Sequence, residues 1–343
     1  MNRGMKWCWL VLLAGLASCA YAGDKTIGYQ LLQQVKLPDD GGWDYLLVDS
    51  AARRVYITHE TEVLVVDADT YQVIGKVEGI QGAHGVALAP ELGKGYVSSG
   101  KSGSVVVFDL KTLKKIAEVS ARKGSDAIVY EPVTGRVFAF NGSSGNCTAI
   151  DAASDKEVAT FDLGGKPEFA AVDGKGYVYD NLEDKNALVK IDAKTLEIIH
   201  CWPVAPGDSP SGLAMDTKSN RLFIGCHNKK VVVMGAVKGT VIQTLPIGQG
   251  IDATYFDPAS GTVFNSCGEG VLSVAHQKSA DRYKVVENAK TQPGARTMAF
   301  DAKTGHVFLV TAQFEAAPAP TKENPKPRRK MVPGTFELLV LGR

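Results

Sequence analysis

The chain has 343 residues, of which 45% are hydrophobic and 22% charged, and its formal net charge is +1. This is the composition of an ordinary globular protein, and so small a charge gives no general attraction to nucleic acid or to an anionic membrane. The 36 glycines suit an all-β protein rich in turns, and the length suits a closed array of repeats better than one sandwich.

The N-terminus has the pattern of an export signal. Arg3 and Lys6 precede a short apolar run, and Ala20-Tyr21-Ala22 forms a small-residue cleavage site. The apolar run is too short to span a membrane. We therefore predict a signal peptide over 1–22 and one exported domain over 23–343, periplasmic or secreted, with no transmembrane segment after cleavage.

A unit of four short strands follows the leader and recurs about every 41 residues, the period of a propeller blade. The clearest copy spans 82–119, where HGVALA, KGYVSS, SVVVFD and KKIAEV are separated by Gly, Pro and Asp turns. The seven first strands begin at Asp44, His84, Asp126, Glu168, Ser211, Asp252 and Arg296. Only six fourth strands are complete, and 29–37 supplies the seventh if it pairs beside 336–342. The sequence predicts an all-β, seven-bladed β-propeller whose last blade is closed by the N-terminal strand.

The end of each second strand carries a recurring tetrapeptide. Four copies are Tyr56-Ile-Thr-His59, Tyr96-Val-Ser-Ser99, Phe138-Ala-Phe-Asn141 and Tyr177-Val-Tyr-Asp180. Over 27–343 the repeats resemble those of the YVTN β-propeller family. The resemblance implies an exported, YncE-like arrangement of seven blades, and it says little of activity because these residues build blades. Single-stranded DNA binding is associated with one branch of that family.

The first residues of the seven innermost strands form the strongest site signal. Innermost strands line the central channel, so these polar side chains are expected to converge at one mouth as a ligand site. Four of the seven are carboxylates, which raise one another's pKa and favour a cation. Asp126, Glu168 and Asp252 are the expected ligands of a calcium or magnesium ion. The alternative is that these positions are solvated, turn-forming residues.

The second strands return to the same mouth, so their last residues are expected to form an outer ring. His59 and Asn141 are the members predicted to reach a ligand, and Asp180 is the expected strand end in the fourth repeat. His227 lies one residue beyond another strand end. Trp43, just before the first strand, offers an aromatic wall.

Six cysteines are present, two of them in the leader. Cys19 ends a Leu-Ala-Ser-Cys sequence, so a lipoprotein acylated there is the alternative to plain cleavage. The other four are Cys147, Cys201, Cys226 and Cys267. None stands in a C-x-x-C pair, which argues against a c-type haem or a zinc ribbon. Cys226 and Cys267 are equivalent in neighbouring repeats, and two buried thiols are favoured over a disulfide because adjacent blades splay apart.

Residues 312–334 interrupt the last repeat. This stretch is rich in proline, has no strand pattern and contains the basic run KPRRK at 326–330. It joins a second strand to a third strand and therefore emerges on the face of the mouth. We expect an insertion that folds over the mouth as a lid, the alternative being a solvated, disordered insertion.

Three functions are compatible with this sequence. A binding or scaffold propeller for a small molecule or an envelope protein comes first, because the polar mouth has no recognisable nucleophile. A metal-dependent hydrolase or lyase similar to the lactonase propellers comes second, with His84 or His59 as the general base, so an enzyme is left open but not favoured. Single-stranded DNA binding comes last, because it requires a basic groove with stacking aromatics and this mouth is acidic.

Overall fold

We describe a computed structural model of the chain, covering residues 1, 28–38, 40–316, 318–319, 321, 327 and 329–343. Apart from Met1, the predicted signal peptide, with Cys19, lies outside these described residues. No helix within the described ranges is long and apolar enough to cross a bilayer.

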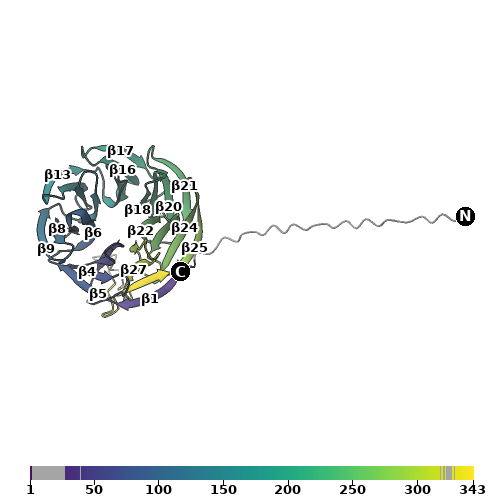
Figure 1. Cartoon of the computed structure of the whole chain (residues 1–343), viewed down its shortest axis with the longest axis horizontal. Coiled ribbons are helices and arrows are strands. Elements are labelled where there is room, and N and C mark those ends of the chain that lie inside the picture. Colours follow the sequence, from purple (N-terminus) through teal and green to yellow (C-terminus); the bar gives the residue numbers. More distant parts are fainter. Residues whose placement is uncertain (2–27, 39, 317, 320, 322–326, 328) are drawn as a thin grey trace.

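Seven four-stranded antiparallel sheets are arranged as blades around a central axis (Figure 1). Blades 1 and 2 are β2 (Trp43–Asp49), β3 (Arg54–His59), β4 (Glu62–Asp67), β5 (Val73–Glu78), then β6 (Ala83–Ala89), β7 (Lys94–Ser99), β8 (Ser104–Asp109), β9 (Lys115–Ser120). Blades 3 and 4 are β10 (Ser125–Glu131), β11 (Arg136–Asn141), β12 (Asn146–Asp151), β13 (Lys156–Asp162), then β14 (Pro167–Val172), β15 (Tyr177–Leu182), β16 (Ala187–Asp192), β17 (Ile198–Pro203). Blades 5 and 6 are β18 (Pro210–Asp216), β19 (Arg221–Cys226), β20 (Lys230–Gly235), β21 (Thr240–Pro246), then β22 (Ile251–Asp257), β23 (Thr262–Cys267), β24 (Val271–Ser279), β25 (Arg282–Lys290). Blade 7 is β26 (Met298–Phe300), β27 (Val307–Thr311), β28 (Glu337–Gly342) and β1 (Gln30–Lys36); two short 3₁₀ turns are η1 (Pro90–Leu92) and η2 (Glu183–Lys185).

The predicted closure of the ring is confirmed. β1 pairs antiparallel with β28, from Gln30 opposite Gly342 to Lys36 opposite Glu337, and Figure 1 shows the two strands side by side. The N-terminal strand is therefore the fourth and outermost strand of the sheet that contains β26, β27 and β28. This pairing gives blade 7 four strands, as in the other blades, and covers the outer edge of β28.

Burial explains why the third strands read as continuous apolar runs. β4, β8 and β20 are buried on both faces, because blades pack against each side of them, and their sequences are EVLVVD, SVVVFD and KVVVMG. The outermost β5 and β9 are largely exposed and carry mixed sequences. Hydrophobic packing between blades, rather than within one sheet, makes up the core.

The register of the fourth blade differs from the sequence prediction. Tyr179 pairs with Ala171 in the way that Tyr96 pairs with Ala87 in blade 2. The predicted strand end, Asp180, is therefore an interior residue two positions before the true end. The prediction was wrong because two similar KGY sequences were aligned, although the spacing between the first and second strands differs in the two blades.

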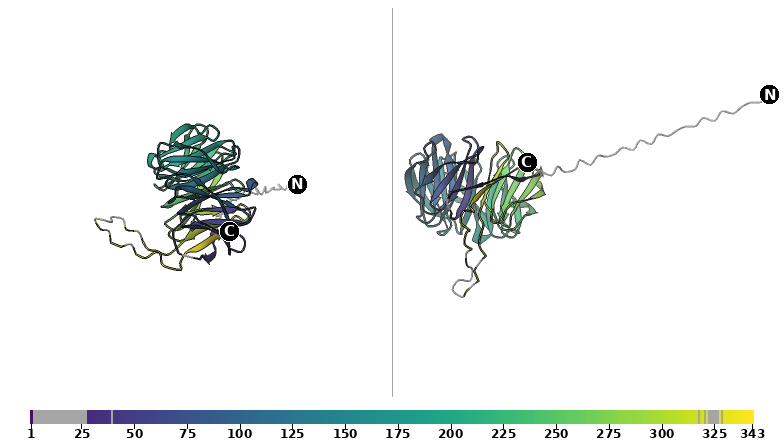
Figure 2. Two further views of the ribbon diagram at one scale, coloured as in Figure 1. Left: turned by 90° about the vertical axis from the view of Figure 1, so that its left-hand side faces the viewer. Right: turned by 90° about the horizontal axis from the view of Figure 1, so that it is seen from below.

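The insertion between β27 and β28 begins as a two-stranded ribbon. The Glu315 amide donates to the Lys330 carbonyl at 2.9 Å, and the Val332 amide donates to the Gln313 carbonyl at 2.8 Å. Figure 2 shows that its described residues run outward from the ring rather than across it. The expected lid is thus not seen in the described part of the insertion, and the KPRRK run lies partly outside the described residues.

Candidate functional site: the acidic channel mouth

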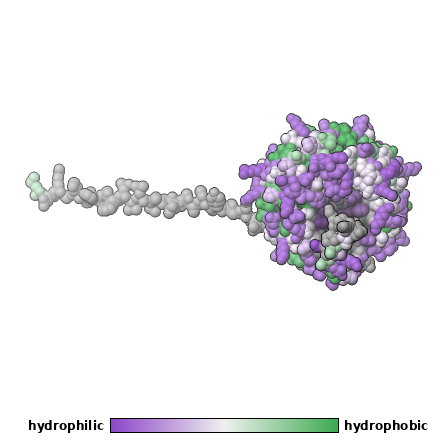
Figure 3. Space-filling view, turned by 180° about the vertical axis from the view of Figure 1, so that it is seen from behind, coloured by the Kyte–Doolittle hydropathy of each residue, from purple (hydrophilic) through white to green (hydrophobic). Residues whose placement is uncertain are grey.

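A bulge positions the side chains at the mouth. In blades 1 to 6 the pairing of the innermost strand with the second strand shifts register after its first residue, for example between Trp43 and Leu46 and between Ala83 and Val86. Asp44, His84 and their counterparts lie within these shifts. A bulge of this kind frees a side chain from the alternation of the strand and re-aims it, here toward the channel. The mouth opens on a face covered mostly by hydrophilic side chains (Figure 3).

Hydrogen bonds between blades fix the backbone of the same residues. The donors are polar side chains at the penultimate position of a second strand, and the acceptors are carbonyls of mouth residues in the next blade. The pairs are Thr58 to His84 at 2.9 Å, Asn181 to Ser211 at 2.8 Å, Ser98 to Asp126 and Ser266 to Arg296. Four of the seven predicted mouth residues are thereby tied to the preceding blade.

His84 bridges two carboxylates. Its Nδ1 lies 2.6 Å from Asp44 Oδ2 and 3.5 Å from Asp126 Oδ1. Burial alone would lower the imidazole pKa, but the hydrogen bond to Asp44 and the charge of Asp126 outweigh it, so the pKa is raised. One ligand atom from each of these three residues lies within 4.8 Å of the others. These three side chains are compact enough to hold one metal ion.

Asp252 and Arg296 form a second group. Arg296 Nη1 lies 2.9 Å from Asp252 Oδ2, and the Ser211 hydroxyl donates to Asp252 Oδ1 at 3.4 Å. Burial raises the pKa of Asp252 to about 6, with Arg296 opposing the shift. Two more of the predicted mouth residues thus surround this carboxylate, and the positive charge of Arg296 partly compensates it.

Glu168 belongs to a third group, which sequence reasoning did not find. Lys166 Nζ lies 3.1 Å from Glu168 Oε2 and also pairs with Glu183. Burial raises the pKa of Glu168 to about 7 despite Lys166. His227 joins this group through its Nε2, 3.8 Å from Glu183 Oε1. The sequence Lys-x-Glu at 166–168 was the available signal for this ion pair.

Two carboxyl groups of blades 3 and 4 have buried oxygens that accept no hydrogen bond. Asp126 Oδ1 is buried and accepts none, and removal from water followed by the charge of Asp44 raises the Asp126 pKa to about 8. Asp180 is fully buried, and neither of its oxygens has a partner. Burial, then Glu168 and Asp126, raise its pKa well above the usual range. A buried carboxyl group without a hydrogen bond lowers the free energy of unfolding.

The position of Asp180 is apolar in most other blades. The equivalent residues are Ile57, Val97, Ala139, Ile224, Asn265 and Leu309. Asn265, the other polar one, is satisfied, because its amide accepts from Thr254 at 3.1 Å and donates to the Ser273 carbonyl at 3.3 Å. Asp180 is thus an exception among the seven, and it lies beside the mouth carboxylates.

Two aromatic rings span the channel next to the ring of mouth residues. Tyr45 and Phe169 come from blades 1 and 4, which are not neighbours, and their centroids are 4.9 Å apart in an edge-to-face contact. Burial, then the charges of Asp126 and Asp44, raise the pKa of Tyr45 well above its usual value. At the five equivalent positions the residues are small: Gly85, Ala127, Gly212, Ala253 and Thr297. An acidic mouth with an aromatic floor results.

The expected outer ring is not an exposed surface. His59 is 3% exposed and stacks on Phe336 at 4.8 Å, and Trp43 stacks on the same ring at 5.4 Å. Asn141 is fully buried, and its amide donates to Asn146 at 2.9 Å. His59 and Trp43 therefore pack at the base of the insertion. Strand ends are buried here because the turns that follow fold back over them, which strand spacing alone does not reveal.

The four described cysteines are free, and Cys226 and Cys267 are buried thiols. Of the three residues predicted to bind metal, only Asp126 belongs to the close group with Asp44 and His84. Glu168 and Asp252 face Lys166 and Arg296 instead.

No protein-family model and no curated protein matches this sequence. Solved structures do match its fold. Kuenenia stuttgartiensis hydrazine synthase is 15% identical with a TM-score of 0.69, covering 82% of this chain and 96% of that one. The WD40 repeats of RRP9 are 7% identical with a TM-score of 0.74, covering 91% and 97%. A chain of the mitotic checkpoint complex is 14% identical with a TM-score of 0.74, covering 100% and 99%. At these identities the likeness shows the fold alone, a seven-bladed β-propeller.

Proposed function

We propose that this protein is a binding propeller whose acidic mouth takes a cation. The observation that carries the proposal is the group of Asp44, His84 and Asp126, with three ligand atoms within 4.8 Å of one another. In this group a proton on His84 is the positive charge held between two carboxylates, and a bound cation would replace it. The fully buried Asp180 beside this group has no hydrogen-bond partner, and its pKa is raised by burial, so a cation bound nearby would favour its ionised form.

The chemistry of the donors narrows the cation. Two carboxylates and one imidazole suit a divalent ion such as Zn²⁺ or Mn²⁺ better than Ca²⁺ or Mg²⁺, which prefer all-oxygen ligands. The aromatic floor formed by Tyr45 and Phe169 also suits an organic ammonium group. Both share one requirement, a positive charge among carboxylates, and the experiment below separates them.

The test is calorimetry and thermal shift on chelator-treated protein. We expect Zn²⁺ or Mn²⁺ to stabilise the wild type, and Asp126→Asn to weaken that binding at least tenfold. The control is Glu269→Gln, which removes one exposed carboxylate from another turn of the same face and should change nothing. A response to spermidine but not to metal would assign an organic cation. Identical responses of wild type and Asp126→Asn to every cation would refute the proposal.

We also propose that the protein is an exported, YncE-like member of the YVTN propeller family. The support is the tetrapeptide at the ends of β3, β7 and β11 together with the leader-like pattern at 1–22. Fractionation of cells expressing the full chain tests this: the protein should be recovered from the envelope or medium with its leader removed. A Cys19→Ala change that releases it from membranes would instead identify a lipoprotein.

A metal-dependent hydrolase or lyase is the second candidate. The observation favouring it is the 2.6 Å contact between His84 and Asp44, the geometry of an imidazole oriented by a carboxylate. Turnover of a lactone by metal-loaded protein, lost in His84→Gln, would establish it. Single-stranded DNA binding is disfavoured because the described mouth presents carboxylates, which repel phosphates.

A further inference from the structure

The end of the channel opposite the acidic mouth holds a cavity of about 850 Å³. It is lined by the far ends of the innermost strands of blades 1 to 4. A volume of this size is typical of sites for small organic ligands. The Tyr45–Phe169 pair lies between this cavity and the acidic mouth, so it is a separate site.

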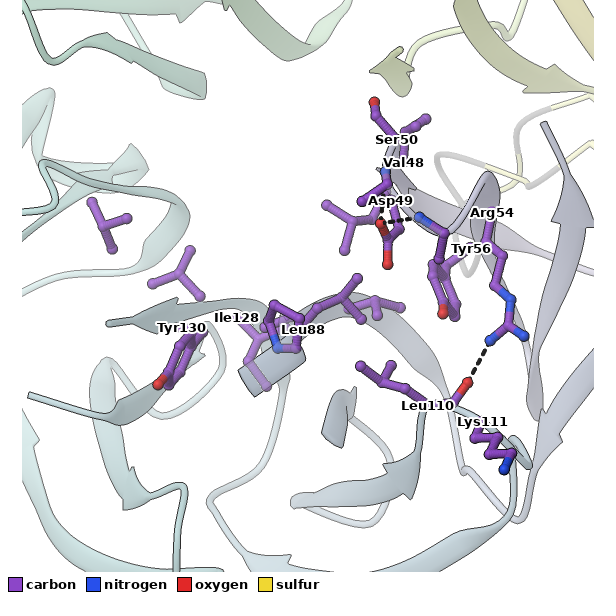
Figure 4. A pocket seen from close by; sticks show the side chains of 18 residues that line it. Val48, Asp49, Ser50, Arg54, Tyr56, Leu88, Leu110, Lys111, Ile128 and Tyr130 are labelled. Atoms are coloured by element: carbon purple, nitrogen blue, oxygen red, sulfur yellow. Dashed lines mark hydrogen bonds between the residues drawn. The ribbon is translucent and has the colours of Figure 1, made fainter. Parts of the chain in front are cut away.

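The walls of this cavity are apolar on one side and cationic on the other (Figure 4). Val48, Leu88 and Ile128 form the apolar side, and Arg54 and Lys111 lie together on the other. One carboxylate, Asp49, also lines the cavity, but it accepts the amides of Ala51 and Ala52 at 3.1 and 2.9 Å. Arg54 and Lys111 are two positive charges and Asp49 is one negative charge, so the lining of the cavity has a net positive charge.

A buried hydroxyl without an acceptor faces the same cavity. Tyr56 is fully buried, and its hydroxyl has no hydrogen-bond partner. The equivalent tyrosines in blades 2 and 4 are satisfied: Tyr96 donates to the Ala152 carbonyl at 2.9 Å, and Tyr179 donates to the Ala236 carbonyl at 3.4 Å. In blade 1 the matching carbonyl belongs to Leu110, and Arg54 donates to it instead.

The Tyr56 hydroxyl, which has no acceptor, indicates what kind of group a ligand would place beside it. A buried hydroxyl without a partner is unfavourable, and a ligand acceptor would satisfy it. The Tyr56 hydroxyl and the Arg54 and Lys111 cations are donors, with Arg54 also donating to the Leu110 carbonyl, and the one lining carboxylate, Asp49, accepts two amides through its Oδ1. The donors match an anionic acceptor with two oxygens, and the opposite wall matches an apolar body.

We propose that this cavity binds an amphipathic carboxylate, that is, an apolar chain or ring ending in one carboxylate. Its apolar part lies against Val48, Leu88 and Ile128, and its carboxylate accepts the Tyr56 hydroxyl beside Arg54 and Lys111. This site is independent of the cation site proposed above, and either can exist without the other.

The test is isothermal titration of the full protein with decanoate, with decanol and decylammonium as probes of the same length. We expect one decanoate to bind per chain, decanol to bind at least tenfold more weakly and decylammonium not to bind. Tyr56→Phe should weaken decanoate binding about tenfold, the loss typical of a hydrogen bond to a charged group, without lowering Tm. Lys111→Gln should weaken it severalfold.

The matched control is Tyr96→Phe. It removes the same hydroxyl from blade 2, where the hydroxyl already has an acceptor, so Tm should fall while decanoate affinity stays unchanged. Three results would overturn the proposal: no binding of decanoate, equal affinity for decanoate and decanol, or equal effects of Tyr56→Phe and Tyr96→Phe on affinity.

Discussion

The carboxylates of the outer hairpin turns and those of the channel mouth experience opposite environments. Asp67 and Asp192 are each the last residue of a strand and accept backbone amides from two and three residues further on, and these hydrogen bonds lower their pKa. Asp126, Glu168 and Asp180 lie between blades, and burial raises theirs. Carboxylates that are given donors build the turns. Asp180, whose buried oxygens accept no hydrogen bond, destabilises the fold, and Asp126 Oδ1 remains available to a ligand.

The largest expected effect is a fall in stability as pH rises from about 4 to 8. A carboxyl group whose pKa is raised in the folded protein binds more protons there than in the unfolded chain. The free energy of unfolding is therefore highest below the pKa of the unfolded chain, and it decreases as pH rises toward the pKa of the folded protein. For Asp126 this window ends at about pH 8, for Glu168 at about 7 and for Asp252 at about 6. The raised pKa of His84 acts in the same direction.

Urea unfolding across this pH range measures the effect. Asp126→Asn should reduce the fall more than the corresponding change at Glu168 or Asp252, because its pKa is displaced further than theirs. Below pH 4 the turn carboxylates have the opposite sign, and stability should fall as they become protonated. A curve that is flat or rises from pH 4 to 8 would contradict this account of the mouth.

Next in size is the effect of Asp180→Val. Valine occupies the equivalent position in blade 2, and the change removes a buried carboxyl with no hydrogen bond, so we expect a gain of about 2 kcal/mol. Chemical denaturation at neutral pH measures it. Asn265→Val is the matched control: the side chain there is hydrogen-bonded, so stability should decrease. If Asp180→Val also destabilises, the carboxyl has a structural partner.

A smaller loss is expected from Asp67→Ala in a turn. This change removes acceptors for the Asp69 and Thr70 amides, at 3.0 and 2.7 Å, and should cost about 1 kcal/mol. The pH dependence between 4 and 8 should keep its slope, because that slope belongs to the mouth. A changed slope would show that the two sets of carboxylates are coupled.

The smallest effect is expected from deleting residues 318–329. Among the described residues of the insertion, those at its base contact the propeller, through Phe314 against Trp43 and the Gly334 amide to Asp40 at 2.8 Å. Stability should change by less than about 0.5 kcal/mol. The pH dependence should also be unchanged. A steeper fall with pH would mean that the basic residues of the insertion neutralise the mouth after all.

The sequence was sufficient for the fold because its signals are local. Strand periodicity, turn residues and a regular repeat identified seven blades, and counting fourth strands predicted that β1 closes the ring, as confirmed. The same alignment identified the innermost-strand residues that contain the close group of Asp44, His84 and Asp126. It placed Asp180 two residues out of register, because the spacing between strands varies from blade to blade.

Contacts between blades could not be predicted from the sequence. The partners of Asp252 and Glu168, the meeting of Tyr45 with Phe169 and the unsatisfied Tyr56 hydroxyl depend on residues brought together by the closed ring. Only comparison of equivalent positions hints at them, since Asp180 replaces an apolar residue and Tyr45 and Phe169 replace small ones.

The Tyr45–Phe169 contact has a consequence for transport through the molecule. Two rings from blades 1 and 4 meet in the channel and obstruct it between its two ends. Strand β2 runs past this contact, with Asp44 toward the acidic mouth and Val48 toward the cavity at the other end. The two proposed sites therefore lie on opposite sides of this contact, so a cation and an amphipathic carboxylate would not compete for one site.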